Sequence, residues 1–458
     1  MIREVRQLLD EKKYAQLRDL LCSKEPADIA QLFEQFPKEE LPLMFRILQK
    51  DFATEVFVEM DTELQKALID AFTDKELFEV FDDLFMDDTV DIIEEMPANV
   101  VKRILRHSTP EKRAEINHLL QYRPDSAGTI MTTEFVDLKE DMTCEEAFAF
   151  IRKTGLEKET VYTCYVMDAK RILIGVVTVK DMIMAGSDAV IGTIMEKNPI
   201  FVYTDDDKED VMKAITKYDF LAMPVTDREG RLVGIVTVDD AMDVLQEEDT
   251  EDMEIMAAIT PTDKPYFRVG VFETWKKRIP WLLLLMISAT FTSKVLTHFE
   301  NALNSLPILM AFVPQLMDTG GNAGSQTSVT VIRGLSLGDI RLKDTLRVLW
   351  KEFRVSVLCA VALGIVNFIK MFIFNDVSRA RFGLSQSLLI SFVVCATIAC
   401  TVVIAKIVGC MLPMLAKRLG LDPAVMASPF ITTIVDILSL LIYFGIAAAL
   451  LDSVGAAI

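Results

Sequence analysis

The chain of 458 residues has a formal net charge of −20, yet its mean hydropathy is +0.30, which does not fit one uniform soluble domain. Residues 266–458 contain 10 acids and 17 bases, and the other 58 acids and 31 bases lie in residues 1–265. An acidic surface repels phosphate, so nucleic-acid binding is not expected. The 51% hydrophobic content excludes a disordered chain, and the seven cysteines form no CxxC pair that would indicate a zinc site. The N-terminal residues lack the apolar core of a signal peptide, so we expect the acidic half in the cytosol.

Residues 1–127 have the pattern of an acidic, all-α N-terminal domain. Similar helix-then-proline units end at Pro37 and Pro97, and residues 55–60 form a weaker copy. Apolar residues recur at helical spacing within these units. The pattern predicts short helices stacked as a small superhelical array.

A different and duplicated pattern follows in residues 128–246. The segment 175–181 (GVVTVKD) is repeated as 234–240 (GIVTVDD), and the Ile-Met pair at 130–131 is repeated at 194–195. The two copies, 128–191 and 192–246, resemble a tandem pair of α/β CBS domains, each a βαββα module. That resemblance implies a cleft that often binds an adenine nucleotide, with Asp181 or Asp240 on the ribose hydroxyls. A purely structural role for the pair is the alternative.

Acidic residues form stripes in the soluble half. Five of them step by three or four residues and therefore share one helical face: Asp240, Asp243, Glu247, Glu251 and Glu254. This stripe enters an expected connecting helix at 247–275, and further acidic groups lie within residues 83–95 and 205–210. Oxygen-only ligands suit Mg²⁺ or Ca²⁺, so the stripes predict surfaces that divalent cations bring together. A solvated helix face is the simpler alternative.

Residues 276–458 contain apolar stretches long enough to cross a membrane, and we expect an α-helical transmembrane domain of five helices. The spans lie at about 279–297, 303–332, 355–375, 386–414 and 427–451, and the second is expected to be interrupted at 319–326. The basic connecting segments all fall on the side of the N-terminal domain. This places the N-terminal domains in the cytosol and the C-terminus outside.

Asp436 is the only charged residue of the fifth span and lies near its middle. A carboxylate at that depth costs at least about 2.5 kcal/mol, so a functional role is the default interpretation, and an ion pair with Lys406 is the alternative. Small and amide residues of the second span, including Asn322, Ser325 and Gln326, are expected to line the same path. A two-fold pore would present two Asp436 side chains to one hydrated cation, which predicts a homodimer in the lipid bilayer.

Together, the acidic helical domain, the CBS pair, the acidic connecting helix and the motifs TGGNxGxQ and PxxTxxD resemble the MgtE family of bacterial magnesium transporters. The resemblance covers essentially the whole chain. It implies a homodimeric, Mg²⁺-selective channel of the inner membrane that cytosolic Mg²⁺ closes by bridging the acidic domains, with ATP bound to the CBS pair.

The resemblance also assigns residues. The pore would use Asp436, Thr432 (through its carbonyl) and Asp422. The cytosolic Mg²⁺ sensor would use Glu55, Asp87, Asp91, Asp207, Asp219, Asp240, Asp243, Glu248, Glu251 and Asp252. The nucleotide contacts would be Lys180, Asp181 and Phe220, and the family commonly has Arg at the position of Lys180, which implies a weaker nucleotide site.

Other functions fit parts of the sequence. A transporter of Co²⁺, Mn²⁺ or an anion would keep the topology and change the selectivity. A membrane-anchored nucleotide sensor would not need a carboxylate at mid-span. An intramembrane protease is disfavoured because the chain has three histidines and no HExxH motif, and no enzymatic activity is expected.

Overall fold

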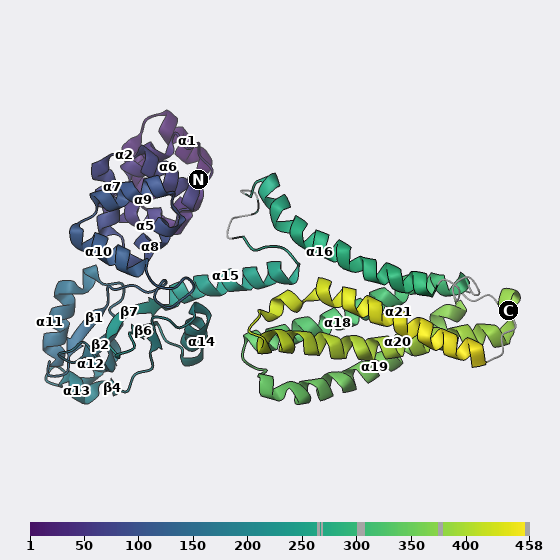
Figure 1. Cartoon of the computed structure of the whole chain (residues 1–458). Helices are drawn as coiled ribbons and strands as arrows, with labels where there is room; N and C mark the ends of the chain where they lie inside the picture. The colour runs from purple at the N-terminus through teal and green to yellow at the C-terminus, as the bar shows by residue number, and fades with distance from the viewer. Residues whose placement is uncertain (263–265, 267–268, 300–306, 374–378, 454–458) are drawn as a thin grey trace. The chain divides into compact units, whose positions relative to one another are not determined.

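The computed structural model describes residues 1–458 except 263–265, 267–268, 300–306, 374–378 and 454–458 (Figure 1). The chain divides into two compact units, Met1–Leu245 and Gln246–Ile458.

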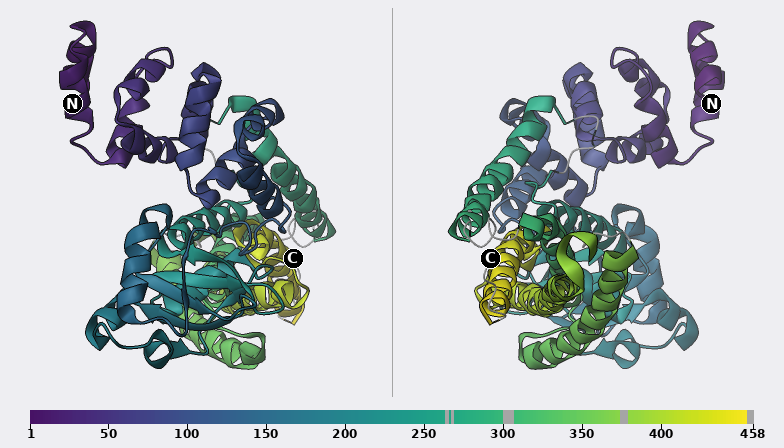
Figure 2. Two further views of the ribbon diagram at one scale, coloured as in Figure 1. Left: turned by 90° about the vertical axis from the view of Figure 1, so that its left-hand side faces the viewer. Right: turned by 90° about the vertical axis from the view of Figure 1, so that its right-hand side faces the viewer.

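The first unit begins with short helices whose apolar faces share one core. They are α1 (Ile2–Asp10), α2 (Tyr14–Leu21), α3 (Pro26–Phe33), α4 (Leu41–Ile47), α5 (Lys50–Val58), α6 (Thr62–Ala71), α7 (Asp74–Asp83), α8 (Met86–Glu95), α9 (Ala98–His107) and α10 (Pro110–Leu119). Figure 2 shows them as successive layers, from the purple N-terminal pair to the blue helices. Phe45, Phe57 and Phe72 are buried and their rings lie 5.2–6.2 Å apart. The all-α superhelical N-terminal domain is therefore confirmed.

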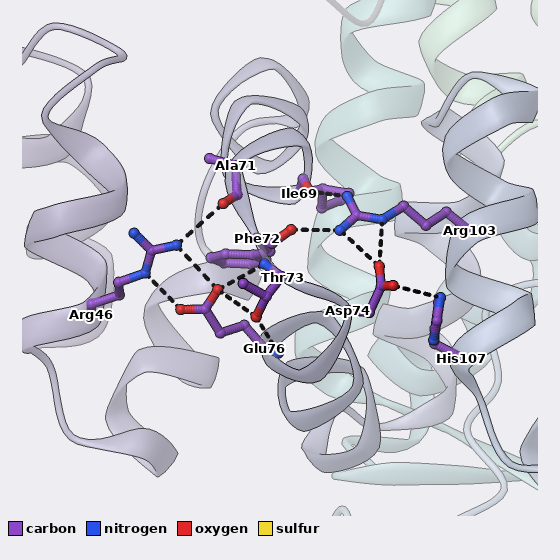
Figure 3. A network of polar contacts seen from close by, with 9 residues as sticks. All are labelled: Arg46, Ile69, Ala71, Phe72, Thr73, Asp74, Glu76, Arg103 and His107. Atoms are coloured by element: carbon purple, nitrogen blue, oxygen red, sulfur yellow. Dashed lines mark hydrogen bonds and ion pairs between the residues drawn. The ribbon is translucent and has the colours of Figure 1, made fainter.

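Two arginines connect the layers of this array (Figure 3). Arg46 of α4 forms an ion pair with Glu76 of α7, with an Nε–Oε1 distance of 2.6 Å. Arg103 of α9 donates to the carbonyl oxygens of Ile69 (2.7 Å) and Phe72 (2.5 Å) and pairs with Asp74. Since the last carbonyls of a helix have no partner within it, Arg103 supplies the donors that the C-terminal end of α6 needs.

Replacing Arg103 with alanine should loosen this part of the array. The change leaves two partly buried carbonyl groups without their donors, at a cost of about 1–3 kcal/mol. Limited proteolysis of the full-length protein should therefore cleave residues 60–110 at least about tenfold faster than in the wild type. Arg106→Ala is the matched control, because Arg106 lies on the same helix with an exposed side chain. Equal cleavage of the two variants would contradict the role given to Arg103.

The CBS pair forms two small sheets. Its elements are β1 (Val136–Lys139), α11 (Cys144–Thr154), η1 (Gly155–Glu157), β2 (Thr163–Met167), β3 (Leu173–Thr178), α12 (Val179–Ala185), α13 (Ile191–Ile194), β4 (Glu196–Lys197), β5 (Val202–Tyr203), α14 (Lys208–Tyr218), β6 (Ala222–Thr226), β7 (Leu232–Thr237) and α15 (Val238–Met256). The strand orders are β1-β2-β3-β4 and β5-β6-β7. In each sheet the first pairing is parallel and the second is antiparallel, as a βαββα repeat requires.

The two repeats exchange their leading segments. Strand β4, at the start of the second repeat, pairs with β3 of the first, and Thr132, at the start of the first, bridges Ile235 of β7. A Cβ at Gly175 would lie 2.5 Å from the sulfur of Met195, and one at Gly234 would lie 2.7 Å from the carbonyl oxygen of Thr132. The duplicated glycine and Ile-Met pair of the sequence are therefore the two halves of this reciprocal packing.

The described part of the second unit consists mainly of long helices. Its elements are α16 (Val271–His298), η2 (Pro307–Phe312), α18 (Val313–Ser336), η3 (Leu342–Asp344), α19 (Thr345–Ile373), α20 (Arg379–Arg418), η4 (Pro423–Met426) and α21 (Ser428–Ser453). In the described part, four helices are long and apolar enough to cross a membrane, namely α16, α19, α20 and α21. Helix α18 is the fifth long helix and is less apolar because of its polar residues.

Two expectations about these helices are wrong. Helix α18 is continuous through residues 319–326, so the second span is not interrupted there. Its glycines instead allow close helix packing: a Cβ at Gly409 of α20 would lie 2.3 Å from the carbonyl oxygen of Gly324. The connecting helix is also shorter than 247–275, since α15 ends at Met256 and α16 begins at Val271. The part of the second span at 303–306 lies outside the described residues.

Candidate functional site

Carboxylates gather where α8 of the N-terminal domain faces the CBS pair within the first unit. Asp87 is 8% exposed, and burial raises its pKa well above the usual range, with further increases from Asp240, Asp88 and Glu159. Burial and the carboxylates around it raise the pKa of Asp88 to about 7 and that of Glu159 to about 7. Asp240, whose carboxylate also accepts hydrogen bonds from Thr237, has a pKa raised by burial to about 6.

The charges acting on Asp87, Asp88 and Glu159 are all negative. Like charges in a partly buried site oppose one another's ionisation, and a divalent cation would remove that opposition. Among the described residues, no three Asp, Glu, His or Cys side chains converge tightly enough to form a ready-made metal site. The arrangement therefore fits a hydrated Mg²⁺, which keeps several waters and uses few direct carboxylate ligands. We call Asp87, Asp88, Glu159 and Asp240 the acidic cluster.

The cluster contains only part of the predicted sensor. Asp87 and Asp240 lie in it, and Asp243 lies near it, with a pKa raised by burial and by Asp239. Glu55 is exposed on α5, and Glu59, which follows the last residue of that helix as its C-cap, acts electrostatically on Asp88. Asp88, Glu159 and Glu59 were missed, although two of them lie within four residues of a predicted ligand.

The other predicted sensor residues lie elsewhere. Asp207 caps the start of α14 and Asp219 follows its last turn with a left-handed backbone (φ 54°), so α14 separates these two carboxylates. Asp91 is exposed on α8. Glu248, Glu251 and Asp252 lie on α15 in the second unit, and Glu251 is exposed.

A cavity of about 610 Å³ opens between the two CBS repeats. Lys180 and Phe220 line it, as predicted, together with Asp219 and Tyr165. Asp181 is not among its lining residues, because its carboxylate accepts hydrogen bonds from the backbone and hydroxyl of Thr178 and thereby caps α12. Tyr165 is fully buried, and its hydroxyl has no hydrogen-bond partner among the described residues. An unsatisfied polar group beside a cavity of this size fits a polar ligand.

In the second unit, Asp436 lies on α21 beside α18. A Cβ at Gly321 of α18 would lie 2.9 Å from Cγ2 of Thr432, one turn before Asp436. The hydroxyls of Thr432 and Thr433 both donate to the carbonyl oxygen of Pro429. The predicted lining residues Asn322 and Gln326 have exposed side chains on α18. Asp422 caps η4 by accepting a hydrogen bond from the backbone of Ala424, so its assignment to the pore has a structural alternative.

Lys406 is not the partner of Asp436. Lys406 is 5% exposed, and its Nζ atom lies 3.8 Å from Oε2 of Glu352. The same ammonium group donates a hydrogen bond to the hydroxyl of Thr327 at 3.1 Å. The alternative interpretation, an ion pair between Lys406 and Asp436, is therefore wrong. In the described part of the chain, Asp436 has no hydrogen-bonding or ion-pairing partner, which leaves its charge unneutralised.

Long apolar helices with an unneutralised carboxylate, joined to a CBS pair, define a multi-pass membrane protein of the ion-transport class. Comparison with family models agrees: a divalent cation transporter model matches residues 313–446, the MgtE intracellular N domain matches 24–125, and the CBS domain matches 127–188 and 191–247. The chain belongs to the MgtE family of magnesium transporters.

Individual relatives support the assignment over the full length. The magnesium transporter MgtE of Thermus thermophilus is 35% identical over 455 residues, which are 98% of each chain. That of Bacillus subtilis is 30% identical over 454 residues, 97% of this chain and 96% of the relative. A crystal structure of the cytosolic domain of the Mg²⁺ channel MgtE in complex with ATP is 35% identical and matches with a TM-score of 0.51, covering 53% of this chain and all of that one. The family resemblance and the fold class are confirmed.

Proposed function

We propose that this protein is a Mg²⁺-selective channel of the cell membrane that closes when cytosolic Mg²⁺ binds its acidic surfaces. The observation that carries the proposal is Asp436, an unneutralised carboxylate on a membrane helix beside a helix with exposed amide side chains. A hydrated cation is the partner that such a site favours, with Thr432 and Asp422 along the same path. The N-terminal domains are cytosolic and the C-terminus is outside, as the basic connecting segments indicate.

The pore is formed by two copies of the chain. One Asp436 is a sparse site for a dication, and a two-fold axis would present two Asp436 side chains to one hydrated cation. The homodimer is thus part of the proposal, and crosslinking of the detergent-solubilised protein tests it.

The acidic cluster is the proposed sensor. Mutual repulsion favours a separated arrangement of the N-terminal and CBS domains at low Mg²⁺, and bound Mg²⁺ favours the compact one. The remaining predicted acids, from Asp91 and Asp207 to Glu248, Glu251 and Asp252, extend this charge along the chain. Several weak sites acting together give a steep response to the Mg²⁺ concentration.

Uptake into proteoliposomes tests the function directly. Purified protein should carry Mg²⁺ into vesicles with low internal Mg²⁺, and millimolar Mg²⁺ on the side of the cytosolic domains should suppress that uptake. Parallel assays with Co²⁺ and Mn²⁺ decide the selectivity. Absence of uptake for all three cations would favour the membrane-anchored nucleotide sensor instead.

The CBS cavity is the proposed nucleotide site. The related cytosolic domain binds ATP, and the cavity here has Lys180 for phosphate, Phe220 for the base and the unpaired hydroxyl of Tyr165. Replacing Lys180 with alanine should weaken ATP binding about 10- to 100-fold in calorimetry, since a charged hydrogen bond contributes about 1.5–3 kcal/mol. Lys170→Ala is the control, because Lys170 is exposed and does not line the cavity. ATP binding that is equal in both variants would remove Lys180 from the site.

A further inference from the structure

Helix α18 carries a polar stripe on the face that the rest of the second unit leaves uncovered. Its exposed side chains include four at intervals of four residues: Asp318, Asn322, Gln326 and Thr330. The opposite face is buried and consists mainly of glycine, alanine and aliphatic residues. Residues four apart lie on one side of a helix, so the stripe is continuous along the helix axis.

This polar stripe is incompatible with contact with lipid. Hydrocarbon cannot satisfy carboxylate and amide groups, and polar residues at that depth face water or protein. Helix α18 is accordingly absent from the helices that qualify as apolar spans in the described residues. A water-filled path along α18 is consistent with both facts.

Asp318 lies at the same level as Asp436. Gly321 packs on Thr432, Gly320 on Val435 and Ser439, and Gly324 on Ile431, so α18 and α21 run antiparallel. Asp318 is one turn before Gly321, and Asp436 is one turn after Thr432. The two carboxylates interact electrostatically, and Asp318 is the charged group that acts on Asp436.

Neither carboxylate is neutralised by protein. In the part of the chain that the structure describes, Asp318 and Asp436 have no hydrogen-bond or ion-pair partner, and the nearby cations are used elsewhere. Lys406 pairs with Glu352 and Thr327, and Lys370 donates to Gln315. Two like charges on neighbouring membrane helices oppose each other strongly unless a cation lies near both.

We infer that Asp318 is a second, specificity-determining carboxylate of the cation path, where it acts with Asp436 to favour hydrated divalent over monovalent cations. This inference rests on the proposed transport function. Each chain then contributes two negative charges rather than one. A dication gains about twice the attraction of a monovalent ion from each charge, so the second carboxylate increases discrimination as well as affinity.

Uptake by the full-length protein in proteoliposomes tests the inference. Asp318→Asn should raise the half-saturating external Mg²⁺ concentration about tenfold, which corresponds to about 1.4 kcal/mol, and should change the maximal rate much less. The same variant should discriminate less against K⁺, and Asp318→Glu should restore most of both properties. Asp339→Asn is the control, since it removes one negative charge from the exposed turn after α18.

The outcomes separate this inference from the proposed function. Wild-type uptake together with an unchanged half-saturation and selectivity in Asp318→Asn would overturn the role of Asp318 and leave the channel intact. Absence of uptake in the wild type would instead overturn the proposed function.

A second measurement reads the position of Asp318 without transport. In a chain whose seven native cysteines are replaced, Asp318→Cys should react with a cationic methanethiosulfonate reagent, and Mg²⁺ should slow that reaction. Lack of reaction, or a rate that Mg²⁺ does not change, would place the side chain outside the cation path.

Discussion

Replacing Asp436 with asparagine should reduce Mg²⁺ uptake at least about a hundredfold while the protein still folds. Asparagine has nearly the same volume and removes only the charge, so packing against α18 is retained. The carboxylate of Asp436 offsets the loss of water around a cation at the middle of the membrane, and the single charge that remains on Asp318 does not replace it. Uptake of Mg²⁺ into proteoliposomes, normalised to reconstituted protein, measures the effect.

Three controls make this result specific. Asp339→Asn should transport like the wild type, since that residue lies in an exposed turn. Asp436→Glu should keep part of the activity because the charge remains. Size-exclusion elution and the Mg²⁺ response of the cytosolic domains should be unchanged in Asp436→Asn, because those domains do not depend on the pore. Uptake by Asp436→Asn at the wild-type rate would show that the cation crosses elsewhere.

Sequence patterns predicted the architecture well where the pattern arises directly from side-chain packing. The duplicated glycine and Ile-Met segments encode the exchange between the two CBS repeats, in which Gly175 contacts Met195 and Gly234 contacts Met131. The N-terminal helical array was predictable for the same reason, because the spacing of its apolar residues matches the buried face of each helix. Because both copies use a glycine packed against a methionine, the same residue types recur at matching positions of the two repeats.

The membrane helices were harder to interpret, because glycine has two uses. The run at 319–326 was predicted to interrupt a span, yet its glycines lie in a continuous helix and let α20 and α21 approach closely. Because of that interpretation, Asp318 was not recognised as a candidate site residue. In a continuous helix, Asp318 lies four residues before Asn322 and eight before Gln326, which places all three on one face. Composition alone does not distinguish a glycine that interrupts a helix from one that allows a neighbouring helix to pack closely.

Charge partners were the least predictable feature. Lys406 was considered as a partner of Asp436, but its ammonium group lies by Glu352 of α19, a residue far from both in the sequence. Likewise the acidic cluster joins α8 to Glu159 and to the start of α15. Such groupings arise from tertiary packing of segments tens of residues apart, and periodicity along the chain carries no information about them.

The acidic cluster should make the cytosolic response to Mg²⁺ depend on pH. The pKa values of Asp88 (about 7), Glu159 (about 7) and Asp240 (about 6) all lie above the usual values near 4. Carboxyl groups whose pKa is raised in the folded form bind more protons there than when unfolded or separated. The compact arrangement is therefore most stable below about pH 4, loses stability as the pH rises to about 7, and above that pH depends on a cation to offset the repulsion.

Protons and Mg²⁺ thus compete for the same oxygens. Protection of the first unit from limited proteolysis should need little Mg²⁺ at pH 5.5, and at pH 8 it should require added Mg²⁺ in the millimolar range. The double variant Asp88→Asn, Glu159→Gln should be protected without Mg²⁺ at both pH values, because the neutral groups no longer repel Asp87 and Asp240. Asp141→Asn, an exposed carboxylate outside the cluster, should keep the wild-type dependence.

Transport connects this cluster to gating. In the double variant, suppression of uptake by Mg²⁺ on the cytosolic side should lose most of its concentration dependence. The Mg²⁺ concentration that gives half-maximal suppression should change at least about tenfold, which corresponds to about 1.4 kcal/mol of differential binding. A neutralised cluster with wild-type suppression would mean that the closing sites lie on α15 among Glu248, Glu251 and Asp252 instead. Because repulsion between partly exposed carboxylates is screened by salt, raising the ionic strength should shift the wild type toward the variant and leave the variant nearly unchanged.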